Sequence, residues 1–188
     1  MPLDLALGNL ARITRSCELP VTIDLERGYA DVAATIASAI AAGAVGCNLE
    51  DGLDDGLRAI DDQVLRLRHA REAAAQARVP MFLNARTDLF LRAPASAHDH
   101  ALATQALERA RAYADAGADG FFVPGLADEA LIAHLTEACP LPLNVMVVPG
   151  LPPLQRLSAL GVARVSHGPG PYLAGMQALT RAAAATMT

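Results

Sequence analysis

Residues 108–125, ERARAYADAGADGFFVPG, contain the unit that decides the fold. Small and apolar residues recur at helical spacing up to residue 116, and charged residues lie opposite them. The next turn is Ala116-Gly117-Ala118, in which glycine suits the C-terminal cap of a helix. An apolar segment, 120–123, then ends at Pro124. The stretch therefore predicts a helix that leads into a buried strand.

The same unit recurs along the chain. Strands are predicted at 21–24, 45–50, 80–84, 120–123, 143–148 and 163–166. Helices are predicted near 3–16, 31–43, 60–78, 99–116, 128–138, 152–160 and 171–185. Apolar strands that alternate with helices indicate a parallel sheet covered by helices. The pattern contains six β/α units, whereas a closed (β/α)₈ barrel has eight in ~250 residues.

An open doubly wound sheet is the competing α/β architecture. Its nucleotide-binding versions are disfavoured, because no GxGxxG follows the first predicted strand and no Walker A sequence occurs. With 188 residues, 53% of them hydrophobic, and no long linker, we expect a single domain over residues 1–188. No apolar run approaches the ~20 residues that span a bilayer, and no signal peptide is recognisable. We therefore expect a cytoplasmic protein without membrane contact.

The charges exclude two classes of function. The net charge is −5 and no basic patch with interleaved aromatic residues occurs, so nucleic acid is not an expected partner. The chain has no lysine, which excludes Schiff-base chemistry through a lysine amine. The three cysteines are far apart without CxxC spacing, which indicates reduced thiols.

Polar residues recur where predicted strands end. Asp24 and Glu26 follow the first strand, Glu50 ends the second, and Arg86 follows the third. The C-terminal ends of parallel strands share one rim, where active sites of such folds are built. Clustered carboxylates of this kind suit Mg²⁺ or Mn²⁺, and an arginine suits a substrate carboxylate. Acidic strand ends can instead cap the following helices, and Asp51 and Asp88 are interpreted in that way.

Five segments together resemble the isocitrate lyase/phosphoenolpyruvate mutase superfamily. They are VTIDLERGYAD, AGAVGCNLEDG, FLNARTD, ERARAYADAGADGFFVPG and PLNVMVVPGLP, in the superfamily's order and spacing. The resemblance implies a (β/α)₈ TIM barrel and a homo-oligomer that exchanges C-terminal helices. It also implies enzymes that make or break C–C or P–C bonds of 2-oxo acids with Mg²⁺.

The resemblance assigns roles residue by residue. Asp24 and Glu50 match metal-site acids, Glu26 matches a second acid of that site, and Arg86 matches the arginine that holds the substrate carboxylate. We therefore expect Asp24, Glu50 and Arg86 to be catalytic, and Asp24, Glu26 and Glu50 to hold Mg²⁺ or Mn²⁺. The expected substrate-binding residues are Arg86, Asn84, Gly28, Tyr29 and His167, the last of these at the end of the final strand.

Three departures from the superfamily pattern limit the function. The loop Gly52–Leu57 reads GLDDGL and lacks the cysteine and lysine of the lyases. The mutase lysine is absent, and Pro124 stands where some members have histidine. The superfamily also has two further strands before the segment that matches here, so we expect an incomplete barrel of about six β/α units.

These observations predict a Mg²⁺-dependent lyase that acts on a 2-oxo acid or a related small-molecule carboxylate. Decarboxylation or retro-aldol cleavage through an enolate is expected, with oxaloacetate preferred to isocitrate, because the loop has no cysteine. Two alternatives are a mutase or phosphonopyruvate hydrolase-like enzyme and a truncated, non-catalytic paralogue.

Overall fold

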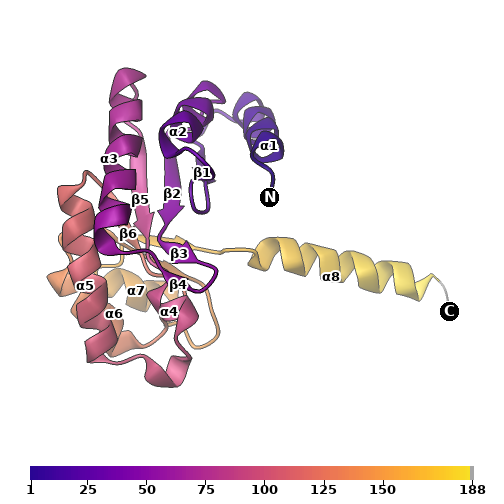
Figure 1. Cartoon of the computed structure of the whole chain (residues 1–188). Helices are drawn as coiled ribbons and strands as arrows, with labels where there is room; N and C mark the ends of the chain where they lie inside the picture. Colours follow the sequence, from indigo (N-terminus) through magenta and orange to yellow (C-terminus); the bar gives the residue numbers. More distant parts are fainter. Residues whose placement is uncertain (187–188) are drawn as a thin grey trace.

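The computed structural model describes residues 1–186 and shows a parallel sheet covered by helices (Figure 1). Within these residues the sheet has six strands: β1 (Thr22–Asp24), β2 (Gly46–Glu50), β5 (Phe82–Arg86), β6 (Gly120–Phe122), β7 (Leu143–Met146) and β8 (Arg164–Ser166). The helices are α1 (Leu3–Ser16), α2 (Val32–Ala41), α3 (Ile60–Gln76), α4 (Leu89–Arg92), α5 (His100–Asp115), α6 (Glu129–Ala138), α7 (Leu154–Ala159) and α8 (Gly170–Ala185), with one 3₁₀ turn, η1 (Ala95–Ala97).

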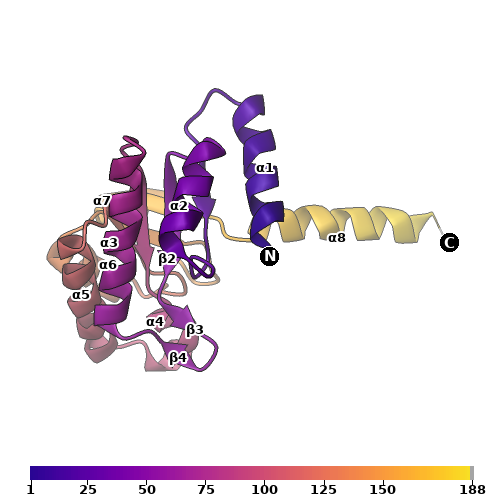
Figure 2. The same cartoon turned by 45° about the horizontal axis from the view of Figure 1, so that its top comes forward.

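The strands lie side by side in chain order, and every pair is parallel. A doubly wound sheet would reverse its order at a switch point, which this sheet does not do within residues 1–186. The sheet curls into a partial barrel with β1 and β8 at its two edges, and α2, α3, α5 and α6 pack side by side on its outer face (Figures 1 and 2). The prediction of an incomplete TIM barrel is confirmed.

The two faces of the sheet differ in polarity, because alternate residues of a strand point to opposite faces. The outer face contributes Leu49, Leu83, Phe121 and Val145 to a core completed by the helices, all of them nearly inaccessible to solvent. Cys47 belongs to the same core, and burial raises the pKa of its thiol to about 12. The inner face carries polar side chains instead, and these build the site described below.

The structure corrects two local predictions. The third strand runs over Phe82–Arg86 rather than 80–84, because Arg86 pairs in register with Glu50 of β2 and Phe122 of β6. The segment 52–57, predicted as a loop, forms a short antiparallel hairpin of β3 (Gly52–Leu53) and β4 (Gly56–Leu57). Arg92 of α4 donates to the carbonyl oxygens of Leu53 and Asp54 and holds this hairpin.

The terminal helices are placed differently. Helix α1 lies beside α2 and buries Leu10 in the core, whereas α8 projects away from the body (Figures 1 and 2). None of the residues of α8 that the structure describes is buried, and Tyr172, Leu173 and Leu179 are exposed. No helix within residues 1–186 is long and apolar enough to cross a membrane.

An amide ladder crosses the inner face below the rim. The side-chain nitrogen of Asn84 donates to Asn48 Oδ1 and to Asn144 Oδ1, both at 2.9 Å, and Ser166 Oγ donates to Asn144 Oδ1 at 3.2 Å. Asn84 thereby connects β5 to β7 across Gly120 of β6, its register partner. A Cβ at Gly120 would lie 2.8 Å from Asn84 Oδ1, so glycine makes this crossing possible.

We expect Gly120→Ala to destabilise the protein by about 1–3 kcal/mol through overpacking and loss of the ladder. Gly8→Ala is the matched control, because Gly8 lies in α1 and a Cβ added there would have nothing within 4 Å. That substitution should leave stability unchanged or raise it by up to about 1 kcal/mol. Urea unfolding of both variants measures the difference, and equal midpoints would contradict the role of Gly120.

Candidate functional site

A cleft of about 930 Å³ opens at the C-terminal ends of the strands. The polar side chains that line it are Asp24, Asn48, Arg86, Arg164, Ser166 and His167. They come from β1, β2, β5 and β8 and from the segment after β8, with Phe122 and Met146 between them. The cleft lies at the rim expected from the sequence. Asp24, Arg86 and His167 line it, whereas Glu26 and Glu50 do not.

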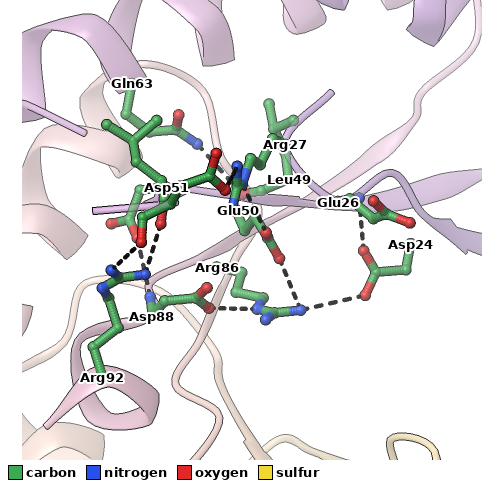
Figure 3. A network of polar contacts seen from close by, with 12 residues as sticks. Asp24, Glu26, Arg27, Leu49, Glu50, Asp51, Gln63, Arg86, Asp88 and Arg92 are labelled. Carbon is green, nitrogen blue, oxygen red and sulfur yellow. Dashed lines mark hydrogen bonds and ion pairs between the residues drawn. The ribbon is translucent and has the colours of Figure 1, made fainter. Parts of the chain in front are cut away.

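Arg86 occupies the centre of a charged network (Figure 3). Its Nε donates to Asp88 Oδ1 at 2.7 Å, and its Nη1 lies 3.0 Å from Glu50 Oε2 and 3.6 Å from Asp24 Oδ2. The guanidinium also lies over the ring of Phe122, 5.9 Å from the ring centroid. The second terminal nitrogen of Arg86, Nη2, makes none of these contacts within residues 1–186. It is also not a buried nitrogen that lacks a hydrogen-bond partner. This edge of Arg86 is the one left for a ligand.

Glu50 titrates far from its usual range. Burial raises the pKa of its carboxyl from 4.5 to about 7, and the charges of Asp88 and Asp24 raise it further against the opposing effects of Arg86 and Arg27. Its side chain is 12% exposed. The titration of Glu50 is therefore shifted toward neutral pH, which is the range in which an acid or base residue is useful.

Asp24 and Glu26 are joined by a local turn. The backbone amide of Glu26, whose φ is +51°, donates to Asp24 Oδ1 at 2.8 Å, and Asn48 Nδ2 donates to Asp24 Oδ2 at 3.3 Å. The Glu26 carboxylate pairs with the amine of Met1 at 3.1 Å rather than with Arg86. Asp24 and Glu50 are thus brought together around Arg86, and Glu26 lies at the margin of the site (Figure 3).

The charge balance of this site fits a divalent cation. Ion pairs join two arginines, Arg27 and Arg86, to four carboxylates, Asp24, Glu50, Asp54 and Asp88. When all are ionised, the site carries an excess of two negative charges, and its donors are the hard oxygens that Mg²⁺ prefers. No three His, Cys, Asp or Glu side chains within residues 1–186 form a ready metal cage. The geometry therefore suits an ion that keeps several waters and contacts one or two carboxylates directly.

Three predicted substrate residues do not line this cleft. Asn84 is 2% exposed and uses its amide in the ladder between strands. Gly28 is buried with φ +77°, and a Cβ there would meet Leu49 at 2.8 Å, so its role in the fold is close packing. Tyr29 is half-buried; burial and the nearby Glu26 and Asp24 raise the pKa of its hydroxyl.

Sequence reasoning missed several polar residues of the inner face. Asn48, Asn144, Arg164 and Ser166 all face the barrel interior. The signal was present as period-two alternation, for example Asn48-Leu49-Glu50, which a parallel strand with two apolar faces would not show. Within residues 1–186, no ion pair or side-chain hydrogen bond is made by the Arg164 guanidinium, and Arg164 lines the same cleft as Arg86.

Asp51 and Asp88 were interpreted as caps or turn formers, and the structure gives them other contacts. Asp51 is fully buried and accepts hydrogen bonds from Tyr113 Oη at 2.8 Å and Arg109 Nη1 at 3.0 Å. Asp88 precedes α4, but its carboxylate binds Arg86 instead of a helix amide. Asp51 lies one residue beyond β2 and Asp88 two residues beyond β5, so their spacing from the strands did not mark these contacts.

Comparisons with known proteins agree with this fold. A crystal structure from Burkholderia cenocepacia, provisionally named a phosphonomutase, superposes with a TM-score of 0.94 at 52% identity, over 96% of this chain and 75% of that one. The Mycobacterium tuberculosis protein Rv1998c, which is uncharacterised, is 41% identical over 88% of this chain and 60% of its own length. Oxaloacetate decarboxylase from Pseudomonas fluorescens is 33% identical over 89% of this chain and 58% of its own.

Other relatives broaden the chemistry of the group. The 2-methylisocitrate lyase of Escherichia coli is 30% identical over 96% of this chain and 62% of its own. A structure of phosphonopyruvate hydrolase with oxalate and Mg²⁺ superposes with a TM-score of 0.80, over 96% of this chain and 65% of that one, but its 20% identity shows the fold alone. The chain thus spans about three-fifths of the length of the curated relatives it matches.

The family model described as phosphoenolpyruvate phosphomutase matches residues 1–187, which is nearly the whole chain. Together with relatives that include lyases, decarboxylases and a phosphonomutase, this match places the partial barrel and its rim in one group of enzymes. The chain belongs to the phosphoenolpyruvate mutase/isocitrate lyase superfamily.

Proposed function

We propose that this protein is a Mg²⁺-dependent carbon–carbon lyase that cleaves a 2-oxo acid or a close carboxylate relative, with oxaloacetate as the favoured substrate. The observation that carries the proposal is Arg86, which three carboxylates hold in the cleft while its Nη2 edge stays available. A guanidinium edge of this kind binds a carboxylate through charge-assisted hydrogen bonds. The similarity to oxaloacetate decarboxylase supports the choice of substrate.

Each residue of the rim has a role in this reaction. Arg86 binds the carboxylate next to the 2-oxo group and fixes the substrate in the cleft. Asp24 and Glu50 would hold Mg²⁺, directly or through water, and Glu26 would add charge from the margin. When bound, Mg²⁺ supplies a Lewis acid for the negative charge that develops on the 2-oxo oxygen. His167 and Arg164 form the opposite wall, where a second anionic group of the substrate would lie.

The hairpin Gly52–Leu57 restricts the reaction class. It offers carboxylates at Asp54 and Asp55 but no cysteine or lysine that could protonate a product from this position. Decarboxylation needs no such acid from the hairpin, because C–C cleavage releases CO₂ and water can protonate the enolate at carbon. Oxaloacetate therefore suits this site better than isocitrate does.

Two alternatives remain open. The similarity to a phosphonomutase favours a P–C bond substrate, whereas the absence of a catalytic lysine counts against it. A non-catalytic paralogue would retain the fold without turnover. The proposal also includes a homo-oligomer, since Tyr172, Leu173 and Leu179 leave α8 with an uncovered apolar surface.

Substrate turnover separates these possibilities. With Mg²⁺ present, we expect oxaloacetate to yield pyruvate and isocitrate to remain intact, as followed by a coupled assay for pyruvate and by NMR of the reaction mixture. Phosphonopyruvate is the third substrate in the screen. Cleavage of isocitrate alone would overturn the proposed class, and no turnover of any of the three would favour the non-catalytic alternative.

Arg86→Lys should lower kcat/KM by roughly a hundredfold, because an ammonium cannot reproduce the planar contacts of a guanidinium to the substrate and to Asp88. Arg156→Lys is the matched control, since Arg156 forms an exposed pair with Glu129 and neither residue lines the cleft. Steady-state kinetics on both variants provide the measurement. Similar activity in the two would remove Arg86 from the substrate site.

Mg²⁺ affinity should rise with pH through about 7. The cation binds the ionised carboxylate, and protons compete with it below the raised pKa of Glu50. Calorimetric titration at pH 6 and pH 8 should therefore give tighter binding at pH 8, by roughly tenfold. Glu50→Gln should bind weakly at both pH values. A parent affinity that does not change with pH would exclude Glu50 from the metal site.

A further inference from the structure

Asp88 makes the shortest ion pair of Arg86, yet it is neither a metal-site acid nor a cap of the following helix. Asp88 Oδ1 accepts from Arg86 Nε at 2.7 Å, while Glu50 and Asp24 approach Nη1 at 3.0 and 3.6 Å. The Asp88 and Glu50 side chains are each only 12% exposed, whereas that of Asp24 is 46% exposed. Asp88 is thus the protected partner at the Nε edge of this guanidinium, as Glu50 is at Nη1.

Asp88 is itself held from behind by Asp51. The backbone amide of Asp88 donates to Asp51 Oδ1 at 3.0 Å, and the other oxygen of Asp51 accepts from Tyr113 and Arg109 of α5. Asp51 is completely buried, so its charge must be compensated within the protein. Arg109, 3.0 Å away, supplies that compensation. The result is a continuous chain of contacts from α5 to Arg86.

Gly52 closes the remaining side of Asp88. A Cβ added to Gly52 would collide with Asp88 Oδ2, so only a residue without a side chain lets the carboxylate occupy this position. The residues Asp51 and Gly52, which directly follow Glu50 on β2, therefore fix Asp88 by a hydrogen bond and by close packing.

We propose that Asp88 is a positioning residue that sets the plane of the Arg86 guanidinium for the substrate carboxylate. This inference rests on the proposed function, in which Arg86 binds that carboxylate. Asp88 holds the planar guanidinium at Nε, and Glu50 holds it at Nη1. These two contacts fix the plane of the group, and the plane in turn fixes the direction in which Nη2 points. Binding then loses little side-chain freedom.

Asp88 has a second effect within the same geometry. Without Asp88, Glu50 and Asp24 alone would compensate the positive charge of Arg86, and these are the carboxylates proposed to hold the cation. Because Asp88 accepts the hydrogen bond from Nε, part of the negative charge of Glu50 and Asp24 stays uncompensated by Arg86. The buried acid thus separates the substrate-binding and cation-binding tasks of one crowded site.

Asp88→Asn tests the inference, with oxalate and Mg²⁺ as the probe for substrate binding. We expect oxalate affinity to fall about ten- to hundredfold in calorimetry, the equivalent of one charge-assisted hydrogen bond. KM for oxaloacetate should rise more than kcat falls, because the variant keeps Arg86 but loses its orientation. Gly52→Ala should act in the same direction by displacing the intact carboxylate of Asp88.

Asp119→Asn is the matched control. Asp119 also pairs with an arginine, Arg71, but it precedes β6 at the opposite end of the sheet and supports the fold alone. The control should lower stability without changing oxalate affinity. The Nε–H signal of Arg86 in ¹⁵N NMR, assigned by its loss in Arg86→Lys, should lose exchange protection in Asp88→Asn and not in Asp119→Asn.

The readouts separate the proposed function from the positioning role. A parent that fails to bind oxalate would count against the proposed function, and the NMR signal would still test whether Asp88 orients Arg86. Equal oxalate affinity in the parent protein and in Asp88→Asn would overturn the positioning role. An unchanged Arg86 signal in Asp88→Asn would overturn it as well.

Discussion

The parallel register of β2 and β5 places Glu50 directly beside Arg86, and the geometry of the site follows from that pairing. Two residues earlier, the same register pairs Asn48 with Asn84, whose amides are hydrogen-bonded. A shift by one residue would turn Arg86 toward the helices and place Leu83 or Ala85 in the cleft. The backbone ladder therefore determines the chemistry of the rim before any substrate is present.

The amide ladder shows how this register is maintained in a sheet that is polar on one face. Buried amides must be hydrogen-bonded, and Asn84 meets that requirement only when β5 and β7 lie at the correct offset on either side of Gly120. An incorrect offset would leave amides unsatisfied. Polar groups thus specify the alignment of strands, while the apolar outer face provides most of the burial.

The order of strands and helices and the rim positions of Asp24, Glu50 and Arg86 could be predicted from the sequence, because these features depend on local periodicity and on the shared direction of parallel strands. The burial of Asn84 and its absence from the lining of the cleft could not be foreseen, since burial of a polar group depends on which side chains face it across the sheet. Asp51 and Asp88 were misjudged for the same reason. Arg109 and Tyr113, the partners of Asp51, lie on another element, α5. Arg86, the partner of Asp88, is near in sequence, but no sequence spacing reveals the orientation that joins the two side chains.

The hairpin that follows β2 joins a fixed base to an exposed tip, at which Asp54 pairs with Arg27. Glu50, Asp51 and Gly52 each satisfy a separate contact requirement, so substitution at any of them disturbs a different partner. By contrast, the turn at Asp54 and Asp55 is exposed, and Arg92 reaches the hairpin through backbone oxygens that any residue provides. The tip is accordingly the natural place to graft a new proton donor. An engineer could exchange Asp55 to alter the reaction while Glu50, Asp51 and Gly52 preserve the scaffold and Asp54 keeps its ion pair with Arg27.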